Sequence, residues 1–483
     1  MKKIGCWLLA SMLASPAWGQ EPLAEIDSLI KRMLPESSEV GIAVYDLTAK
    51  RRLYAYRAEK LSRPASTLKL LTAITALARP DADQPFRTEV RHDGVIARDT
   101  LHGNLYVVGG FDPELDGEAL DSLVERTASR GFSVITGGVY GDVSLKDSLR
   151  WGQGWAWDDE PAAFQPHLSP LMLCKGTVEI TVGPTPAKGD TAAILAAYPR
   201  SSFYTLRNET KSRTPSAGDF ALTRDWMEHG NHIVVSGNVD KIRKGQVSVY
   251  DSPRFFMRTF LDRLQARGIA PKDTILRFAE LPADSDSVRV SAPLAVWETP
   301  MYTVLRQLMK NSDNLNAEAL LCRVGAEASG KRHVAAEDGI VEIMKLVRQL
   351  GHDPKTIQIA DGCGLSNYNY LSPSLLVDFL AYAYSRADIF NALYRALPTG
   401  GVDGTLKYRM RKAPTRGNVH AKTGSFTAIN TLAGYIDRQD GHTLAFAIMN
   451  QNILSAKQAR DFQDEVCGLL LRYADPDGVK KNK

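Results

Sequence analysis

The feature that most constrains the fold is a change of pattern along the chain, which is helical at both ends and strand-like in the middle. From about residue 86 to about residue 282, short alternating apolar segments are separated by Gly, Pro, Asp and Asn, as is typical of strands and turns. Helical periodicity occurs before this stretch and again after residue 293. Helical ends separated by β-structure predict one α/β domain whose sequence is interrupted by an insertion.

The periodicity also places individual elements. Helices are expected at residues 23–34, 66–78, 117–129, 252–267, 299–310, 314–329, 336–350 and 455–473. In the outer segments, strands are expected at residues 40–46, 53–56, 420–437 and 442–450.

The first 19 residues have the composition of a secretory signal peptide. Lys2 and Lys3 precede an apolar run over residues 4–14, and Ala17-Trp18-Gly19 offers small residues for cleavage. The apolar run is shorter than the roughly 20 residues that span a bilayer, and no later stretch of the sequence reaches that length. We therefore expect an exported protein without a stable membrane anchor.

Charge and cysteine spacing exclude several kinds of partner. The net charge of +4 is small for 483 residues, and the basic residues are scattered, so nucleic acid is not an expected partner. Cys174, Cys322, Cys363 and Cys467 are widely spaced, which allows disulfide pairing without implying it. No C-x-x-C pair indicates a zinc or redox site, and neither a metal nor a cofactor is expected.

A serine and a lysine three positions apart form the first candidate for catalysis. Ser66-Thr-Leu-Lys69 begins the helix expected at 66–78, where this spacing places both side chains on one face. A serine hydroxyl needs a base within reach to become a nucleophile, and apolar surroundings lower the pKa of a lysine toward that use. The spacing alone is weak, because Ser28-Leu-Ile-Lys31 repeats it on the polar side of the first helix.

A second motif, Ser312-Asp-Asn314, opens the helix expected at 314–329. By itself it is also compatible with an ordinary helix cap, a position that Ser and Asp favour. Ser236-Gly-Asn238 is similar but is expected to be a turn.

The third motif, Lys422-Thr-Gly424-Ser425, begins an expected strand. Because Gly424 has no side chain, a substrate backbone can pair with this strand as an added strand. Lys422, with the hydroxyls of Thr423 and Ser425, would then bind a terminal carboxylate.

The three motifs, in this order and in these contexts, are the signature of penicillin-binding proteins and class A β-lactamases. The chain resembles the class C low-molecular-mass penicillin-binding proteins, a family of D-alanyl-D-alanine carboxypeptidases and endopeptidases. The long stretch between Ser66 and Ser312 is characteristic of that family. The other segments that resemble it are Gly109-Gly-Phe-Asp-Pro113, Gly137-Gly-Val-Tyr-Gly-Asp142, Gly154-Trp-Ala-Trp-Asp-Asp159, Asp361-Gly-Cys-Gly-Leu-Ser366 and Leu397-Pro-Thr-Gly-Gly-Val-Asp-Gly404.

The resemblance implies a transpeptidase-like or β-lactamase-like α/β domain, with an antiparallel sheet flanked by helices and interrupted by β-rich inserted domains. Residues 1–19 would be the signal peptide, 20–84 and 285–483 the catalytic domain, 85–167 and 241–284 a second domain, and 168–240 a third domain. It further implies peptidoglycan peptides and β-lactam antibiotics as the binding partners, and the N-terminal signal peptide predicts a periplasmic location.

The catalytic roles of the family carry over to matching positions. The resemblance implies that Ser66 is acylated, that Lys69 is its general base, and that Ser312 passes a proton to the leaving group. The backbone N–H groups of Ser66 and Ser425 would form the oxyanion hole.

The family's substrate-binding roles carry over in the same way. Asn314 would bind a substrate amide, Lys422 would assist electrostatically, and Thr423 and Ser425 would hold the carboxylate beside Gly424.

A loop of the inserted region is also implicated by the resemblance. In the family, the segment that matches Trp157-Asp-Asp159 and Phe164 approaches the mouth of the active site, so Asp159 is a candidate partner for the ammonium of a diaminopimelic acid side chain. The chain departs from its relatives at Asn367, where they often have arginine, and at Cys363, which replaces a serine.

The resemblance implies a DD-carboxypeptidase and DD-endopeptidase that acts through an acyl-enzyme and is captured by penicillin. Two alternatives remain at this point: a β-lactamase, which would need fast hydrolysis of the penicilloyl ester, and a non-catalytic wall-binding protein or β-lactam receptor.

Overall fold

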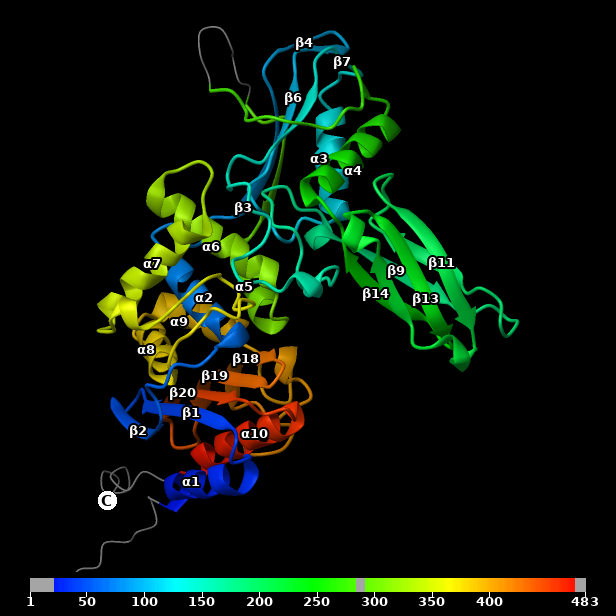
Figure 1. Ribbon diagram of the computed structural model, residues 1–483. Coiled ribbons are helices and arrows are strands. Elements are labelled where there is room, and N and C mark those ends of the chain that lie inside the picture. Colours follow the sequence, from blue (N-terminus) through cyan, green and yellow to red (C-terminus); the bar gives the residue numbers. More distant parts are fainter. Residues whose placement is uncertain (1–20, 284–291, 474–483) are drawn as a thin grey trace, which may run out of the picture.

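The computed structural model describes residues 21–283 and 292–473. The predicted signal peptide at 1–19 lies outside the described residues. The two described ends of the chain meet in one lobe, from which the inserted region projects as two further lobes (Figure 1).

A five-stranded antiparallel sheet of order β18-β19-β20-β1-β2 forms the centre of the lobe that contains both ends. Its strands are β1 (Glu39–Asp46), β2 (Arg51–Tyr56), β18 (Val419–Phe426), β19 (Ile429–Asp437) and β20 (Thr443–Gln451). β19 and β20 are buried along almost their whole length. This burial explains their nearly continuous apolar sequence, because both faces of the sheet are covered by helices.

Two layers of helices cover this sheet (Figure 1). On one face, α1 (Glu21–Met33) packs against α10 (Ala456–Arg472). On the other face, α8 (Pro373–Tyr384) packs on β1, β19 and β20. The remaining helices of this lobe are α2 (Lys69–Leu77), α5 (Met301–Lys310), α6 (Asn314–Ser329), α7 (Ala336–Gln349) and α9 (Ala387–Ala396).

Helix α2 lies at the centre of the helical layer. It contacts α5, α6, α7, α8 and α9, and every residue from Lys69 to Ala76 is buried. A helix surrounded by other helices is apolar on all sides, which matches the sequence Leu-Leu-Thr-Ala-Ile that follows Lys69. Lys69 is therefore placed in the protein interior by the packing of its own helix.

The inserted region comprises β-sheets and two helices, α3 (Gly117–Ala128) and α4 (Ser252–Ala266). One sheet has the order β16-β8-β6-β3-β17 and a second has the order β15-β7-β5-β4. The strands of these two sheets are β3 (Phe86–His92), β4 (Val95–Ala97), β5 (Thr100–His102), β6 (Leu105–Val108), β7 (Val134–Ile135), β8 (Val139–Asp142), β15 (Ala270–Pro271), β16 (Arg277–Phe278) and β17 (Ala295–Thr299).

A third lobe contains the sheets β10-β9-β14 and β11-β13-β12. Its strands are β9 (Thr177–Gly183), β10 (Ala193–Tyr198), β11 (Thr205–Ser212), β12 (Ala221–Arg224), β13 (His232–Val239) and β14 (Arg243–Ser248). The limits of the inserted domains remain a sequence prediction. Strand pairing places β17, which lies after the predicted limit at residue 285, beside β3 in the inserted sheet.

The structure differs from the expected elements in three places. Ser236-Gly-Asn238, which was expected to be a turn, lies within β13 and pairs with β11. The single strand expected at 420–437 is wrong, because Thr427 and Ala428 form a turn between β18 and β19, with Ala428 at a φ of 61°. Helices α8 and α9 were not expected from the sequence pattern.

Cys174, Cys322, Cys363 and Cys467 are free thiols. Among the described residues, no helix has the length and apolar character needed to cross a membrane.

Candidate active site

Ser66 and Lys69 lie on either side of a change in helix geometry. A 3₁₀ turn, Ala65–Leu68, leads directly into α2, and the Ser66 Oγ lies 2.9 Å from the Lys69 Nζ. Ala65 has a φ of 46°, and the backbone of Gly364 lies against it so closely that a Cβ there would be 2.0 Å from the Ala65 carbonyl oxygen. The nucleophile turn is thus held by a neighbouring loop that needs glycine.

The surroundings of Lys69 favour its uncharged form. Its side chain is fully buried, and its Nζ lies 2.7 Å from the Asn314 Oδ1 and 2.6 Å from the Cys363 carbonyl oxygen. Burial lowers the pKa of Lys69 from 10.5. A neutral amine can donate its two hydrogens to these oxygens and direct its lone pair at the Ser66 hydroxyl, which is the geometry of a general base.

Three carboxyl groups near Lys69 oppose this shift. Asp361, Asp313 and Glu318 each raise the pKa of Lys69, but burial is the larger effect. Glu318 is itself fully buried, and burial together with Asp361 raises its pKa to about 7. Glu318 is therefore partly protonated near neutral pH, which weakens its opposition to the neutral amine.

A second buried lysine supports Ser312. The Lys422 Nζ donates to the Ser312 Oγ over 2.7 Å and to the Thr423 carbonyl oxygen over 2.7 Å. Burial, and then the nearby Lys69, lower the pKa of Lys422 well below its ordinary value. Ser312 has a φ of 61°, so its backbone is in the left-handed region that residues with a side chain adopt at a cost.

Strand β18 lies at an edge of the central sheet and passes beside the nucleophile. A Cβ at Gly424 would lie 2.2 Å from the Thr431 Oγ1, 2.8 Å from the Pro64 carbonyl oxygen and 2.9 Å from the Ser66 nitrogen. Glycine therefore allows the edge strand to approach the Ser66 amide. An edge strand can pair with an extended peptide, so substrate bound there would lie against the nucleophile.

The two hydroxyls of β18 have polar neighbours. The Thr423 Oγ1 donates to the Thr405 Oγ1 over 2.8 Å, and the Ser425 Oγ lies 3.4 Å from the Asn430 Oδ1. Ser425 is exposed, so its hydroxyl is accessible to a ligand on the open side of the strand.

The inserted region reaches this site through the loop that follows β8. The Asn314 Nδ2 donates to the Phe164 carbonyl oxygen over 2.9 Å, and the Trp155 Nε1 donates to the Asp361 Oδ2 over 3.0 Å. A cavity of about 610 Å³ lies between this loop and the second motif, with Phe164, Ser312 and Asn314 in its lining.

Asp159 lies on the same loop of the inserted region, outside the three motifs. It ends the short 3₁₀ turn Trp157–Asp159 and is half-buried, and burial together with Asp158 raises its pKa. Within residues 21–283 and 292–473 its carboxylate forms no ion pair. The structure thus brings the residues of the three motifs into one site, and it places Asp159 on the loop that approaches them.

With this geometry established, comparison with known proteins identifies the family. The model of the D-Ala-D-Ala carboxypeptidase 3 (S13) family matches residues 23–473. The chain belongs to this family. It is a serine-type D-Ala-D-Ala carboxypeptidase of the class C low-molecular-mass penicillin-binding type, which confirms the expected fold class and enzyme class.

Relatives of this carboxypeptidase match it over almost the whole chain. It is 31% identical to a D-alanyl-D-alanine carboxypeptidase of Actinomadura sp. (strain R39), over 97% of this chain and 88% of the relative. It is 26% identical to the D-alanyl-D-alanine carboxypeptidase DacB of Haemophilus influenzae, over 91% of each.

Solved structures agree with the fold class. The fold is similar to the crystal structure of penicillin binding protein 4 from Haemophilus influenzae, with a TM-score of 0.79, 24% identity, and coverage of 93% of this chain and 99% of the other. A second structure of that protein, complexed with a β-lactam, matches with a TM-score of 0.71, 21% identity, and coverage of 93% of this chain and 98% of the other.

Sequence reasoning missed the carboxypeptidase's buried acidic loop. Asp361 accepts hydrogen bonds from the backbone nitrogens of Gly364 and Ser366, and Glu318 accepts from the backbone nitrogens of Gly362 and Cys363. The signal for it in the sequence is the glycine-rich segment Asp361–Ser366, because such segments allow the backbone to approach a buried carboxylate closely.

The same loop offers a set of metal-ligating atoms. Those of Glu318, Asp361 and Cys363 lie within 4.8 Å of one another. The Asp361 Oδ2 also accepts from the Cys363 Sγ over 3.4 Å and from the Trp155 indole. The carboxylates thus already accept hydrogen bonds from the protein, so the arrangement is that of a loop clamp rather than of a metal centre.

Proposed function

We propose that this carboxypeptidase cleaves D-alanyl bonds of peptidoglycan as both a DD-carboxypeptidase and a DD-endopeptidase, through an acyl-enzyme at Ser66, in the periplasm. The observation that carries the proposal is the contact of the Lys69 Nζ with the Ser66 Oγ, because it joins a nucleophile to a buried amine that favours its neutral form.

Acylation begins when the neutral Lys69 amine takes the proton of the Ser66 hydroxyl. The Ser66 Oγ forms a bond to the carbonyl carbon of the penultimate D-alanine, and the backbone N–H groups of Ser66 and Ser425 stabilise the oxyanion. Gly424 leaves room for this approach. Lys422, whose Nζ donates to the Ser312 Oγ, would assist electrostatically by directing its N–H groups toward the developing negative charge and the substrate carboxylate.

The bond between the carbonyl carbon and the leaving nitrogen then breaks. The proton taken from Ser66 ends on the leaving amine, delivered through the Ser312 hydroxyl, which Lys422 holds over 2.7 Å. Water next attacks the ester carbonyl and gives a proton to Lys69, and the Ser66 Oγ regains a proton as it departs.

Substrate is held on both sides of the nucleophile. Thr423 and Ser425 on β18 would bind the terminal carboxylate, and Asn314 would bind a backbone amide. The loop that carries Asp159 adjoins Asn314 through Phe164, which supports contact between that loop and the third residue of a stem peptide.

Endopeptidase activity requires room for a leaving group larger than D-alanine. The cavity of about 610 Å³ beside Ser312 supports this, because Ser312 is the residue that would protonate the leaving amine. The β-lactam complex of the Haemophilus influenzae relative supports β-lactam capture here.

Two measurements test this function. A fluorescent penicillin should label the protein at Ser66, and the peptide that carries the label is identified by mass spectrometry. Label that persists in Ser66→Ala would contradict the acyl-enzyme. Digestion of intact sacculi should remove crosslinked dimers as well as terminal D-alanine; loss of D-alanine alone would exclude the endopeptidase reaction.

A further inference from the structure

Each residue of the Ser312-Asp-Asn314 motif is bound by a different lysine. Lys422 binds Ser312 and Lys69 binds Asn314, as described above. The central residue, Asp313, is bound by Lys175, whose Nζ lies 2.9 Å from the Asp313 Oδ2. The first two lysines belong to the motifs of the catalytic lobe, but Lys175 comes from the inserted region.

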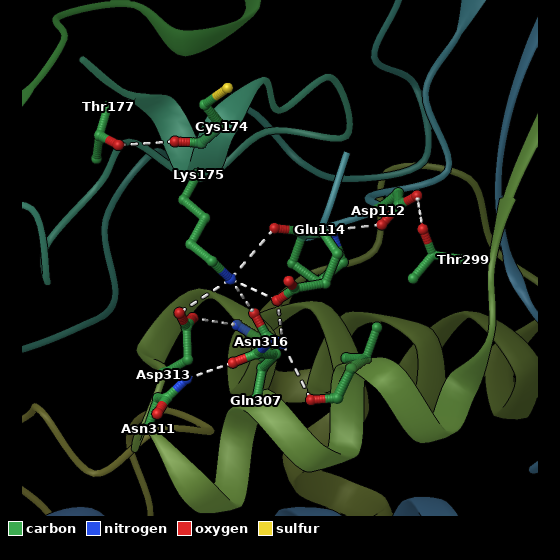
Figure 2. Close-up of polar contacts among 12 residues, drawn as sticks. Asp112, Glu114, Cys174, Lys175, Thr177, Thr299, Gln307, Asn311, Asp313 and Asn316 are labelled. Carbon is green, nitrogen blue, oxygen red and sulfur yellow. Dashed lines mark hydrogen bonds and ion pairs between the residues drawn. The ribbon is translucent and has the colours of Figure 1, made fainter. Parts of the chain in front are cut away.

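Lys175 is surrounded by oxygen acceptors (Figure 2). Its Nζ lies 2.5 Å from the Glu114 Oε1 and 2.9 Å from the Asn316 Oδ1. The buried Asn316 closes the network, because its Nδ2 donates to the same Glu114 oxygen over 2.8 Å. Asp313 uses its other oxygen to cap α6, accepting from the Asn316 nitrogen over 3.1 Å.

The charges of this network favour a permanent ammonium. Although burial acts to lower it, the carboxylates of Asp313 and Glu114 raise the pKa of Lys175 above its ordinary value. The Asp313 and Glu114 side chains are mostly buried, at 17% and 15% exposure. Without the ammonium, two mostly buried carboxylates would face each other at the wall of the cavity that Glu114, Lys175 and Asp313 line.

Backbone strain occurs on both sides of this contact. Cys174, Lys175 and Gly176 are consecutive residues with φ values of 48°, 60° and 66°, and Ser312 has a φ of 61°. Such conformations persist only where surrounding contacts determine them. The ion pair between Lys175 and Asp313 therefore joins two segments with unusual backbone conformations, because Asp313 directly follows Ser312.

We propose that Lys175 is a positioning residue for the active site, which tethers Asp313 to the inserted region and thereby holds Ser312 and Asn314 against Lys422 and Lys69. The inserted region then completes the catalytic geometry, since Glu114 and Lys175 both belong to it. This inference rests on the proposed function, because the motif matters only if acylation occurs at Ser66.

The proposal has an electrostatic consequence that a purely structural role lacks. Burial lowers the pKa of Lys69 and Asp313 raises it, and the other titratable groups that face Lys69 are Cys363, Asp361, Glu318 and Lys422. The Lys175 ammonium partly cancels the field of Asp313 at Lys69. Its removal should therefore raise the pKa of Lys69, whereas removal of the Asp313 charge should lower it.

The test compares acylation by a fluorescent penicillin in wild type and Lys175→Met across pH. We expect the limiting rate to fall about 10- to 100-fold, the loss expected for a reacting group displaced by roughly 1 Å. The acidic limb of the pH profile should move to higher pH. Lys175→Arg keeps the positive charge. It should recover part of the acylation rate, and its acidic limb should lie at the same pH as in the wild type.

Asp313→Asn provides the opposite shift. Asparagine also caps helices, so α6 should keep its start while the carboxylate charge is lost. We expect the acidic limb of Asp313→Asn to move to lower pH. In the double variant that combines Lys175→Met with Asp313→Asn, the acidic limb should return toward its wild-type position. If Lys175→Met does not fold, Lys175→Gln, which keeps hydrogen-bond donors but loses the charge, takes its place, and a folded Lys175→Gln with the wild-type rate and acidic limb overturns the proposal.

Lys244→Met is the matched control. Lys244 also belongs to the inserted region and pairs with Glu179 over 2.9 Å, but its side chain is 64% exposed. We expect Lys244→Met to be acylated at the wild-type rate and with the wild-type pH profile. A folded Lys175→Met with those same properties would overturn the positioning role, whereas failure of the wild-type protein to be labelled at Ser66 would overturn the proposed function instead.

Discussion

Two kinds of lysine meet at the Ser312-Asp-Asn314 motif. Lys69 and Lys422 are fully buried, and within the described residues the hydrogen-bond partners of their Nζ atoms are neutral hydroxyl, amide and carbonyl oxygens. Lys175 is partly exposed and donates to the carboxylates of Glu114 and Asp313. Burial lowers the pKa of the first pair. For Lys175, partial burial acts to lower the pKa, but the carboxylates of Asp313 and Glu114 raise it above its ordinary value.

The difference shows how the surroundings decide whether a lysine side chain can act as a base or serves as a fixed positive charge. An amine among neutral acceptors can lose its proton at moderate pH and accept one from a serine. An ammonium between two carboxylates cannot, and it acts as a fixed positive charge. Burial among neutral contacts lowers the pKa of Lys69 and Lys422, whereas direct pairing with two carboxylates raises that of Lys175, and this difference separates the two roles.

The largest expected effect that tests this comparison is that of Lys69→Met. The variant loses the base, so the rate of Ser66 acylation by penicillin should fall about 10³-fold or more, within the range for general base catalysis. Stopped-flow fluorescence measures this rate. Acylation within tenfold of wild type would show that the proton of Ser66 goes elsewhere.

Lys422→Met should have the next largest effect. We expect acylation to slow about 10²-fold, since one electrostatic contact near the reacting groups is lost while the base remains. Release of D-alanine from a pentapeptide, measured as kcat and KM, should show the loss in both constants. A change in KM alone would restrict Lys422 to carboxylate binding.

The pH dependence of acylation tests the neutral form of Lys69. Below the pKa of Lys69 the rate should rise about tenfold per pH unit and then reach a plateau, because only the unprotonated amine acts as a base. The plateau should begin below the ordinary value of 10.5. A rate that rises without a plateau up to that pH would contradict the effect of burial.

Replacing Lys175 should lower the stability of the fold more than replacing Lys69, which is the reverse of the order expected for the acylation rate. Unfolded Lys69 binds a proton at pH values between its lowered folded pKa and 10.5, where the folded residue has lost it, so stability rises with pH across this window. Lys69→Met removes part of that rise and should not lower the melting temperature at neutral pH. Lys175→Met leaves two carboxylates unpaired and should lower it by a few degrees.

The smallest expected effect is that of Lys244→Met. Its ion pair with Glu179 is exposed, and such pairs contribute about 0–1 kcal/mol. Melting temperature should change little. A shift as large as that of Lys175→Met would show that any lysine in the inserted region has this influence, and the comparison would fail.

The residues of the three motifs could be located from the sequence because their signals are local and their order is specific. Each motif is contiguous and lies at the start of an element that the sequence pattern predicts. The decoys are separated by the fold, since Ser28-Leu-Ile-Lys31 lies on α1 against α10, and Ser236-Gly-Asn238 lies on β13. Spacing alone could not distinguish these copies.

The supporting residues were not predictable, for physical reasons. Lys175 lies in Cys174-Lys175-Gly176, which has no periodicity and matters only through contacts with distant residues. Helix α8 has an apolar sequence without a polar face, because it lies between the sheet and other helices. The turn at Ala428 lacks glycine, asparagine or proline, so β18 and β19 resembled one strand.

The most direct test is an NMR titration of the protein labelled with ¹³C at the lysine Cε, with the signals assigned from Lys69→Met and Lys175→Met. We predict that Lys69 titrates below 10.5 and that Lys175 titrates above it. Equal pKa values, or a Lys69 that stays charged to higher pH than Lys175, would contradict the claim that neutral partners and burial prepare Lys69 as the base.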